Sequence, residues 1–209
     1  MNYYLAVLLA GFLLGSLPWG LWVGWIIKRQ DIRTLGSGNL GATNVFRQVG
    51  PWAGLLVLLL DAGKGYLATA VVPALLPGAE NVPYLKLVGG LAAVTGHVLT
   101  PFANFRGGKG VATTLGVFIG LAPVATAMSF GVWALFVALS GIVSLGSVVA
   151  ALVLPLAVYL TRATVRNHWE AVLVLAVLLT LIIWVRHRAN LKRLMAGTET
   201  SLWRKGDRR

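Results

Sequence analysis

The chain has 209 residues, of which 57% are hydrophobic and only 11% are charged, yet its formal net charge is +12. A soluble basic protein carries charge on about a quarter of its residues, so this composition excludes a soluble nucleic-acid-binding domain, and its hydrophobicity excludes a disordered chain. We therefore predict an all-α, polytopic membrane protein whose few charges gather at particular places.

Apolar segments long enough to cross a bilayer recur along the chain, since a transmembrane helix needs about 20 residues. Four such segments are clear, at 3–27, 52–77, 84–103 and 169–185. The stretch 111–160 contains no charged residue and would be about 75 Å long as one helix, so it must fold back. Breaks near Pro123 and around Ser140–Ser147 divide it into the predicted spans 111–123, 124–141 and 146–161.

The basic residues predict how the chain is oriented. Fourteen of the 18 Lys and Arg residues fall in segments 28–50, 104–110 and 186–209, which the positive-inside rule makes two cytoplasmic loops and a cytoplasmic tail. If Arg162 and Arg166 are external, the stretch 111–160 crosses three times. The prediction is a single transmembrane domain over 1–209 with seven transmembrane helices, the N-terminus outside and the C-terminus cytoplasmic. No basic residues precede the first span, which favours its retention over cleavage.

The first cytoplasmic loop, 28–50, combines glycines with small polar side chains. Residues 36–41 match a G-x-G-x-x-G pattern, but a dinucleotide site needs a preceding β-strand, and here a membrane span precedes the loop. The glycines still let backbone N–H groups converge on an anion, and Arg47 adds a planar guanidinium that suits phosphate. Further neutral donors are Ser37, Asn39, Thr43 and Asn44. We favour an anion site over a flexible turn.

The second loop, 104–110, places Lys109 among glycines at the start of a predicted helix. A Walker loop would require Ser or Thr where Gly110 stands and Gly where Ala103 stands, so ATP binding has no support. The lysine charge, backbone N–H groups and helix dipole together favour an anion, and we predict a phosphate site rather than an interface anchor. His97 is expected to orient this loop.

Two further sets of polar residues lie in or beside the spans. Asp61 and Lys64 share one face of the span 52–77, and either an internal ion pair or a functional site would explain them. After the last span, His187 and Asn190 share a helix face, and a lipid-contacting basic tail does not require them. His168 is expected to be structural. No metal-ligand cluster or Ser-His-Asp set can be assembled, and cysteine is absent, so we expect no metal and no cofactor.

Together these motifs resemble the bacterial membrane acyl-phosphate:glycerol-3-phosphate acyltransferase family, over nearly the whole chain. The matching segments are Gly15–Pro18, Gly36–Arg47, Asp61 with Lys64, Gly96–His97, Gly107–Thr113, Ser144–Ser147, Arg186–Asn190 and Glu199. The resemblance implies transfer of a fatty acyl group from a long-chain acyl phosphate to the 1-hydroxyl of glycerol 3-phosphate. The products are 1-acyl-glycerol 3-phosphate (lysophosphatidic acid) and phosphate, in bacterial phospholipid biosynthesis. It also implies seven spans in the bacterial cytoplasmic (inner) membrane and an active site facing the cytoplasm.

The resemblance and the motifs lead to one hypothesis for the site. Ser37 and Asn190 orient the substrate or bind the developing oxyanion, while His187 is either the base or a group that positions the hydroxyl as a substrate phosphate accepts the proton. The expected substrate- and phosphate-binding residues are Gly36, Ser37, Gly38, Asn39, Asn44, Arg47, Lys64, Gly107, Gly108, Lys109, Gly110, Thr113, Ser147 and Arg186. The expected partners are the two substrates, the lipid bilayer and an enzyme that produces acyl phosphate, with no nucleic acid.

The alternative is a transporter or channel for a small organic phosphate. It predicts polar residues near the bilayer midplane with access from both sides, and only Asp61 and Lys64 answer that description. An acyl-CoA donor is disfavoured because no histidine is followed five residues later by aspartate. A lipid-binding scaffold would leave the three polar motifs unexplained.

Overall fold

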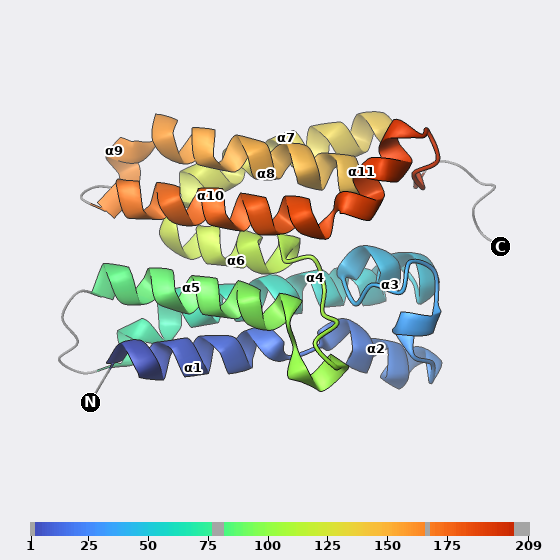
Figure 1. The fold of residues 1–209 in the computed structure, drawn as a ribbon, viewed down its shortest axis with the longest axis horizontal. Coiled ribbons are helices and arrows are strands. Elements are labelled where there is room, and N and C mark those ends of the chain that lie inside the picture. The colour runs from blue at the N-terminus through green and yellow to red at the C-terminus, as the bar shows by residue number, and fades with distance from the viewer. Residues whose placement is uncertain (1–2, 77–81, 166–167, 203–209) are drawn as a thin grey trace. The chain divides into compact units, whose positions relative to one another are not determined.

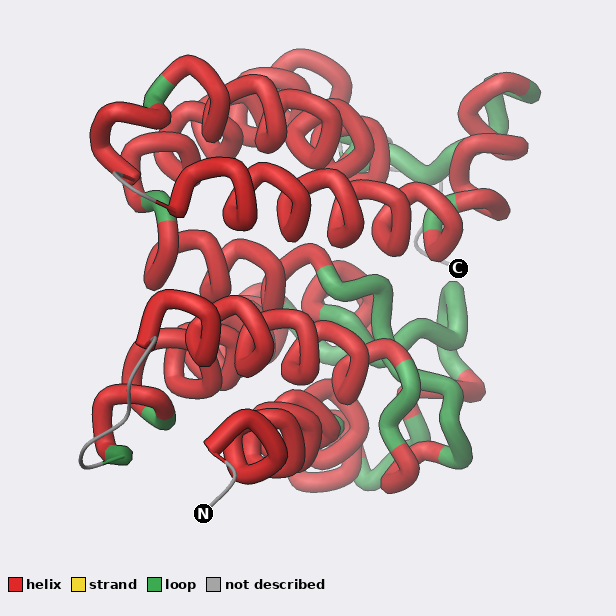
Figure 2. The backbone as a smooth tube through the Cα atoms, turned by 60° about the vertical axis from the view of Figure 1, so that its left-hand side comes forward, coloured by secondary structure: helices red, strands yellow, loops and turns green. Residues whose placement is uncertain are grey.

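The protein is seen here as a computed structural model that describes residues 3–76, 82–165 and 168–202. Every regular element within those ranges is a helix (Figure 2). The chain forms two compact units, Met1–Leu121 and Ala122–Arg209, and each is described by itself. Three predicted features fall outside the described residues: Arg166, the end of the span 52–77, and the tail residues 203–209.

Six helical segments of the described chain are long and apolar enough to cross a membrane. They are Tyr3–Lys28, Pro51–Leu75, Val82–Ala103, Pro123–Ser140, Val143–Leu160 and Trp169–Arg186. Many of their leucines point outward, as Leu139 does with 76% of its surface exposed, which suits a lipid environment and not water. The prediction of an all-helical integral membrane protein is confirmed. The seventh apolar helix, α6 (Val111–Leu121), has 11 residues, and its crossing stays a prediction.

The first apolar segment, Tyr3–Lys28, matches the predicted span 3–27 and consists of two helices, α1 (Tyr3–Ser16) and α2 (Trp19–Lys28). Pro18 has no backbone N–H and cannot continue the hydrogen-bond ladder of α1. The ladder restarts when the N–H of Leu21 donates to the carbonyl of Pro18 at 2.9 Å. The break exposes backbone carbonyls at a point that other parts of the unit then contact.

Close helix contacts hold the first unit together. In Figure 1, α1 runs beside α5 (Val82–Val98), and α4 (Pro51–Tyr66) packs against α6. A methyl group at Gly15 would overlap the backbone of Ala93, and one at Gly116 would overlap the carbonyl of Ala62. Small residues let helix backbones approach closely where there is little hydrophobic driving force between apolar helices in lipid.

Short elements extend these helices. The first loop contains η1 (Ile32–Thr34) and α3 (Ala42–Gln48), and α5 is followed by η4 (Pro101–Ala103). Helix α4 continues through a π turn, η2 (Leu67–Val71), into η3 (Pro73–Leu75). Ile32 and Val45 are fully buried in a cluster with Val57 of α4. This cluster anchors the first loop on the helices beside it.

The second unit consists of α7 (Pro123–Ser140), α8 (Val143–Leu160), α9 (Arg162–Val165), α10 (Trp169–Arg186) and α11 (Arg188–Met195). Helix α8 packs against both α7 and α10. The second predicted break occurs at Gly141, which ends α7 with a φ of 69°. The hydroxyl of Ser140 accepts the N–H of Ile142, so α8 begins at Val143, three residues before the predicted start at 146.

Candidate active site

The first loop is organised by the side chain of Asn44, which lies at the start of α3 and is buried. Its amide nitrogen donates to the carbonyls of Ile32 (3.3 Å), Leu35 (3.0 Å) and Asn39 (3.0 Å). Its amide oxygen accepts the backbone N–H of Ser37 at 3.1 Å. The sequence predicted Asn44 to be a donor to substrate, but these contacts turn the amide inward. Asn44 holds the loop in shape.

The other predicted residues of this loop surround that centre. Gly36 and Gly38 have φ values of 56° and 66°, which favour glycine, and there is no room for a side chain at Gly36 because Asn44 and Gln48 lie against it. The Asn39 side chain accepts the N–H of Gly41 at 2.8 Å. Ser37 is exposed at the surface of the loop. The glycines therefore serve the loop conformation, which leaves the Ser37 hydroxyl accessible.

Arg47 lies on α3, one turn after the loop, and is half-buried. Its position on a short helix is set by the buried residue Val45 and by Gly54 of α4, where a methyl group would overlap Phe46. The α3 helix therefore packs against α4, and this packing fixes the position of the helix that carries Arg47.

The second loop crosses the end of α5. The N–H groups of Gly107 and Gly108 donate to the carbonyls of Val98 and His97, both at 3.1 Å. Gly107 and Gly108 are buried, and Lys109 beside them is half-buried. Gly110 has a φ of 87°, which turns the chain into α6. The glycines are therefore required by close contact with α5 and by the entry to α6, and Lys109 stands at the start of that helix.

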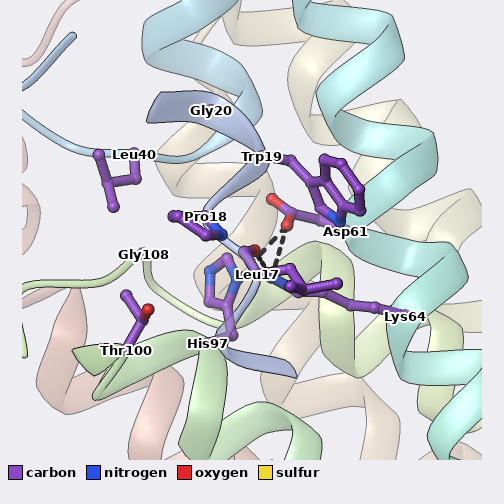
Figure 3. Close-up of a pocket in the computed structure, with 10 residues that line it drawn as sticks. All are labelled: Leu17, Pro18, Trp19, Gly20, Leu40, Asp61, Lys64, His97, Thr100 and Gly108. Carbon is purple, nitrogen blue, oxygen red and sulfur yellow. Dashed lines mark hydrogen bonds and ion pairs between the residues drawn. The ribbon is translucent and has the colours of Figure 1, made fainter. Parts of the chain in front are cut away.

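Three buried polar side chains, Asp61, Lys64 and His97, face one another beneath this loop (Figure 3). We call them the buried charge cluster. The Nζ of Lys64 lies 2.8 Å from Oδ1 of Asp61 and donates to the carbonyl of Leu17 at 2.9 Å. The Nδ1 of His97 lies 3.5 Å from the same Oδ1. Of the two explanations that the sequence left open, these contacts support the internal ion pair.

A small cavity adjoins this cluster, lined by Trp19, Leu40 and Thr100 among others. The space open to a water centre is about 10 Å³, which is about what one water molecule needs. The indole N–H of Trp19 is buried and has no hydrogen-bond partner among the described residues. In this structure the cavity has room for about one water molecule. Lys64 is paired within the protein here, so the proposal below leaves it out of the substrate contacts.

Thr113, also predicted to contact substrate, is fully buried in α6. A methyl group at Gly65 of α4 would overlap its carbonyl, so this turn of α6 lies directly on α4. Its hydroxyl finds no hydrogen-bond partner in the part of the chain that the structure describes. This position is that of a packing residue between helices.

In the second unit, His187 separates α10 from α11 and is 2% exposed. Its backbone N–H donates to the carbonyls of Ile183 and Trp184, both at 3.0 Å, which closes α10. Its ring Nδ1 lies 2.8 Å from the carbonyl oxygen of Ile183. Because a carbonyl can only accept, Nδ1 carries the proton, and in the neutral ring Nε2 is the acceptor. The backbone thus sets the tautomer that a general base requires.

Asn190, on α11, is joined to a buried carboxylate. Its Nδ2 donates to Oε1 of Glu199 at 2.5 Å, and Ser144 of α8 donates to the same oxygen at 2.7 Å. Arg193 donates to Oε2 at 2.6 Å. Burial by itself raises the pKa of the Glu199 carboxyl, but these hydrogen bonds outweigh burial and hold that pKa below its usual value of 4.5. Glu199 therefore ties α8 to α11.

The remaining predicted residues of this unit are Ser147 and Arg186. The hydroxyl of Ser147 is buried and donates to the carbonyl of Val143 within α8 at 2.9 Å. Arg186 is half-buried at the end of α10, next to His187. The sequence assigned no role to Glu199 or Arg193, because a single carboxylate in a basic tail shows no pattern that names its partners.

Within the described residues, no group of three or more His, Cys, Asp or Glu side chains is arranged to hold a metal ion. The predicted site residues offer cationic side chains, backbone N–H groups and hydroxyls, and His187 of the second unit adds an imidazole. Such groups bind phosphate and stabilise developing negative charge.

A family model described as glycerol-3-phosphate acyltransferase matches residues 5–197. The chain belongs to this family. A relative of that description from Desulfotalea psychrophila is 44% identical over 197 residues, covering 94% of this chain and 96% of the relative. Another, from Sinorhizobium medicae, is 43% identical over 202 residues, covering 97% of this chain and 94% of the relative.

Two solved structures are similar to the chain over 95% of its length. Both are of PlsY (YgiH), an integral membrane glycerol 3-phosphate acyltransferase. Its glycerol 3-phosphate form has a TM-score of 0.81 and 35% sequence identity, with 95% of that chain covered. Its lysophosphatidic acid form has a TM-score of 0.80 and 33% identity, with 94% covered. The resemblance seen in the sequence motifs is thus confirmed as family membership.

Proposed function

We propose that this protein transfers a fatty acyl group from a long-chain acyl phosphate to the 1-hydroxyl of glycerol 3-phosphate, giving lysophosphatidic acid and inorganic phosphate. The observation that carries the proposal is the similarity, over 95% of the chain, to PlsY in a glycerol 3-phosphate form and in a lysophosphatidic acid form. These are the acceptor substrate and the product of the proposed reaction. The acyl phosphate donor is what the resemblance of the sequence motifs implies, and the glycine-containing loops that carry Arg47 and Lys109 suit a phosphorylated donor.

In the proposed reaction, the 1-hydroxyl oxygen attacks the carbonyl carbon of the acyl phosphate. The new C–O ester bond forms, the C–O bond to phosphate breaks, and phosphate leaves with the electron pair. We assign the hydroxyl proton to Nε2 of His187, because donation of Nδ1–H to Ile183 leaves Nε2 as the acceptor in the neutral ring. Since the donor is already activated, positioning and electrostatics suffice, and no covalent acyl-enzyme is needed.

The phosphate groups are assigned to the first unit. Lys109 brings a positive charge to the N-terminal end of α6, where backbone N–H groups and the helix dipole also favour an anion. Arg47 brings a guanidinium that can bind two phosphate oxygens, and Ser37 brings an exposed hydroxyl. The conformation of the two loops that make these contacts depends on five glycines: Gly36, Gly38, Gly107, Gly108 and Gly110. The assignments to each unit are made separately and can be tested separately.

In the second unit, Asn190 and Ser147 have hydrogen bonds that tie them to Glu199 and to Val143. Their proposed contribution is to hold α11 and α8 in place, and Arg186 beside His187 adds positive charge that suits a phosphorylated substrate.

We further propose that the protein crosses the bacterial inner membrane seven times, with the loops 28–50 and 104–110 in the cytoplasm. The asymmetric distribution of Lys and Arg supports this topology. A cytoplasmic site receives soluble glycerol 3-phosphate, and an enzyme that produces acyl phosphate supplies the donor. We propose no nucleic-acid partner, because the positive charge is divided among short loops beside apolar spans.

The decisive experiment is an assay of the purified protein with labelled glycerol 3-phosphate and either palmitoyl phosphate or palmitoyl-CoA. We expect labelled lysophosphatidic acid with palmitoyl phosphate and none with palmitoyl-CoA. Equal amounts of inorganic phosphate and lysophosphatidic acid should form. Product from palmitoyl-CoA alone would reject the proposed donor, and no product from either would reject the proposed reaction.

A further inference from the structure

The buried charge cluster joins three parts of the first unit. Asp61 and Lys64 come from α4, and His97 comes from the end of α5. Lys64 reaches the carbonyl of Leu17, which follows α1 and precedes the break at Pro18. One carboxylate oxygen, Oδ1 of Asp61, serves both Lys64 (2.8 Å) and His97 (3.5 Å). The cluster therefore links the α1–α2 break to the last turn of α5.

The opposite side of the His97 ring supports the glycine loop. A methyl group at Gly108 would overlap Nε2 of His97, and one at Gly107 would overlap the His97 carbonyl. A backbone hydrogen bond also holds the loop in place, because the N–H of Gly108 donates to the His97 carbonyl at 3.1 Å. His97 is thus held on its Nδ1 side by Asp61 and lies on its Nε2 side against the residue that precedes Lys109 (Figure 3).

Stability alone does not account for such a cluster. Removing two charges from water is costly, and apolar residues of similar volume often replace a buried ion pair without loss of stability. Charges inside a membrane span usually serve function. The cavity beside the cluster has space for about one water, and the three side chains are engaged with one another and with Leu17. The contact that reaches the proposed phosphate site is the one from His97 to the loop.

We propose that Asp61, Lys64 and His97 are positioning residues for substrate binding. Asp61 and Lys64 fix the orientation of the His97 ring, and the ring fixes the path of Gly107–Gly110, which aims Lys109 at a substrate phosphate. This inference rests on the proposed phosphate-binding role of Lys109. It predicts that disturbing the cluster weakens the same substrate interaction that Lys109 makes and has little further effect once the Lys109 side chain is gone.

The test is a cycle of variants in the purified enzyme, assayed with glycerol 3-phosphate and palmitoyl phosphate. The double variant Asp61→Asn/Lys64→Met removes both charges together, so neither is left buried without its partner. We expect its melting temperature in detergent to stay near that of the wild type, while KM for the substrate affected by Lys109→Ala rises about tenfold. When Asp61→Asn/Lys64→Met is combined with Lys109→Ala, the total rise in KM should stay near tenfold and not reach about a hundredfold.

The same exchange at an exposed ion pair is the control. Asp31 and Arg33 form a salt bridge of 2.6 Å at the surface, and Asp31→Asn/Arg33→Met should leave KM within about twofold of the wild type. If the double variant Asp61→Asn/Lys64→Met does not fold, His97→Gln takes its place in the cycle with the same expectation.

The outcomes separate this inference from the proposed function. Wild-type KM in the cluster variant, with a raised KM in Lys109→Ala, overturns the positioning role alone and leaves a purely structural ion pair. Multiplicative effects in the combined variant also overturn it, because the cluster would then act elsewhere. Wild-type KM and kcat in Lys109→Ala reject the phosphate-binding role of Lys109 and the positioning role with it. A raised KM in both variants without multiplication supports the inference.

Discussion

Three cationic side chains of the first unit, Lys64, Lys109 and Arg47, differ in how deeply they are buried. Lys64 is buried and forms an ion pair with Asp61, and Lys109 and Arg47 are half-buried in the first unit. A half-buried cation is partly open to solvent, so a phosphate can approach it, whereas a fully buried cation such as Lys64 is closed to it. The difference decides which residues to test first.

Replacing Lys109 or Arg47 with alanine should raise KM or lower kcat by about tenfold or more, because one charged hydrogen bond is worth about 1.5–3 kcal/mol. The measurement is steady-state kinetics with each substrate varied in turn. Arg106→Ala removes an exposed charge from the same loop as Lys109 and serves as the control. Wild-type kinetics in both Lys109→Ala and Arg47→Ala would contradict the assignment of the phosphate site.

We propose that His187 is the base, because donation of Nδ1–H to the carbonyl of Ile183 would leave Nε2 as the acceptor of the neutral ring. Replacing it with alanine should lower kcat by about 10²–10⁴-fold, the usual contribution of a general base, while the thermal transition is kept. A variant that keeps nearly normal kcat would eliminate the base and leave the substrate phosphate as proton acceptor.

Glu199 makes stability depend on pH. Because its pKa in the folded protein lies below the usual value of 4.5, the carboxylate stabilises the fold fully above that value and loses this contribution as pH falls through the lowered pKa. The wild type should therefore melt at lower temperature as pH falls below about 4.5, and Glu199→Gln should lack that part of the decline. Melting curves in detergent at several pH values measure it. The same acid dependence in both proteins would contradict this role.

At the scale of elements, the stability of the first unit depends on close contact between the backbones of neighbouring helices. The methyl group of Gly15→Ala would overlap Ala93, so α1 and α5 must separate, and we expect a loss of about 1–3 kcal/mol. Gly131→Ala makes the same change in α7, where nothing lies within 4 Å of the added methyl, and it should be neutral or stabilising. Thermal unfolding in detergent compares the two. Equal effects would show that close packing of α1 on α5 is unimportant.

At the scale of the whole molecule, the number of crossings depends on α6. Its 11 residues span about 17 Å, against about 30 Å of hydrocarbon, so it crosses only if the membrane thins or the adjoining loop enters it. It is shorter than each of the six candidate spans among the described residues, which have 18 to 26 residues. Whether α6 crosses the membrane decides on which side of the membrane α7 begins.

The absence of cysteine makes this testable, because single cysteines can be placed in an unreactive background. Arg33, Arg106 and Ala163 are exposed positions for them. A membrane-impermeant maleimide added to intact cells should label only Ala163→Cys, and the other two should react only after lysis. If Ala163→Cys also requires lysis, α6 does not cross and the protein has six spans.

The sequence by itself determined the fold class, since long apolar segments, few charges and basic loops are properties of local stretches. It also determined the family through motifs that are continuous along the chain. The breaks at Ala122 and Gly141 were close to those predicted, because proline, glycine and serine limit helices locally.

Only the tertiary structure decided what most of the polar side chains do. Asn44 was expected to donate to substrate and instead organises its own loop. Lys64 donates a hydrogen bond to the carbonyl of Leu17, 47 residues away, and Glu199 accepts one from Ser144, 55 residues away. A pattern along the chain can name a donor or an acceptor, but the choice between substrate and protein as its partner depends on which distant groups folding brings within hydrogen-bond distance.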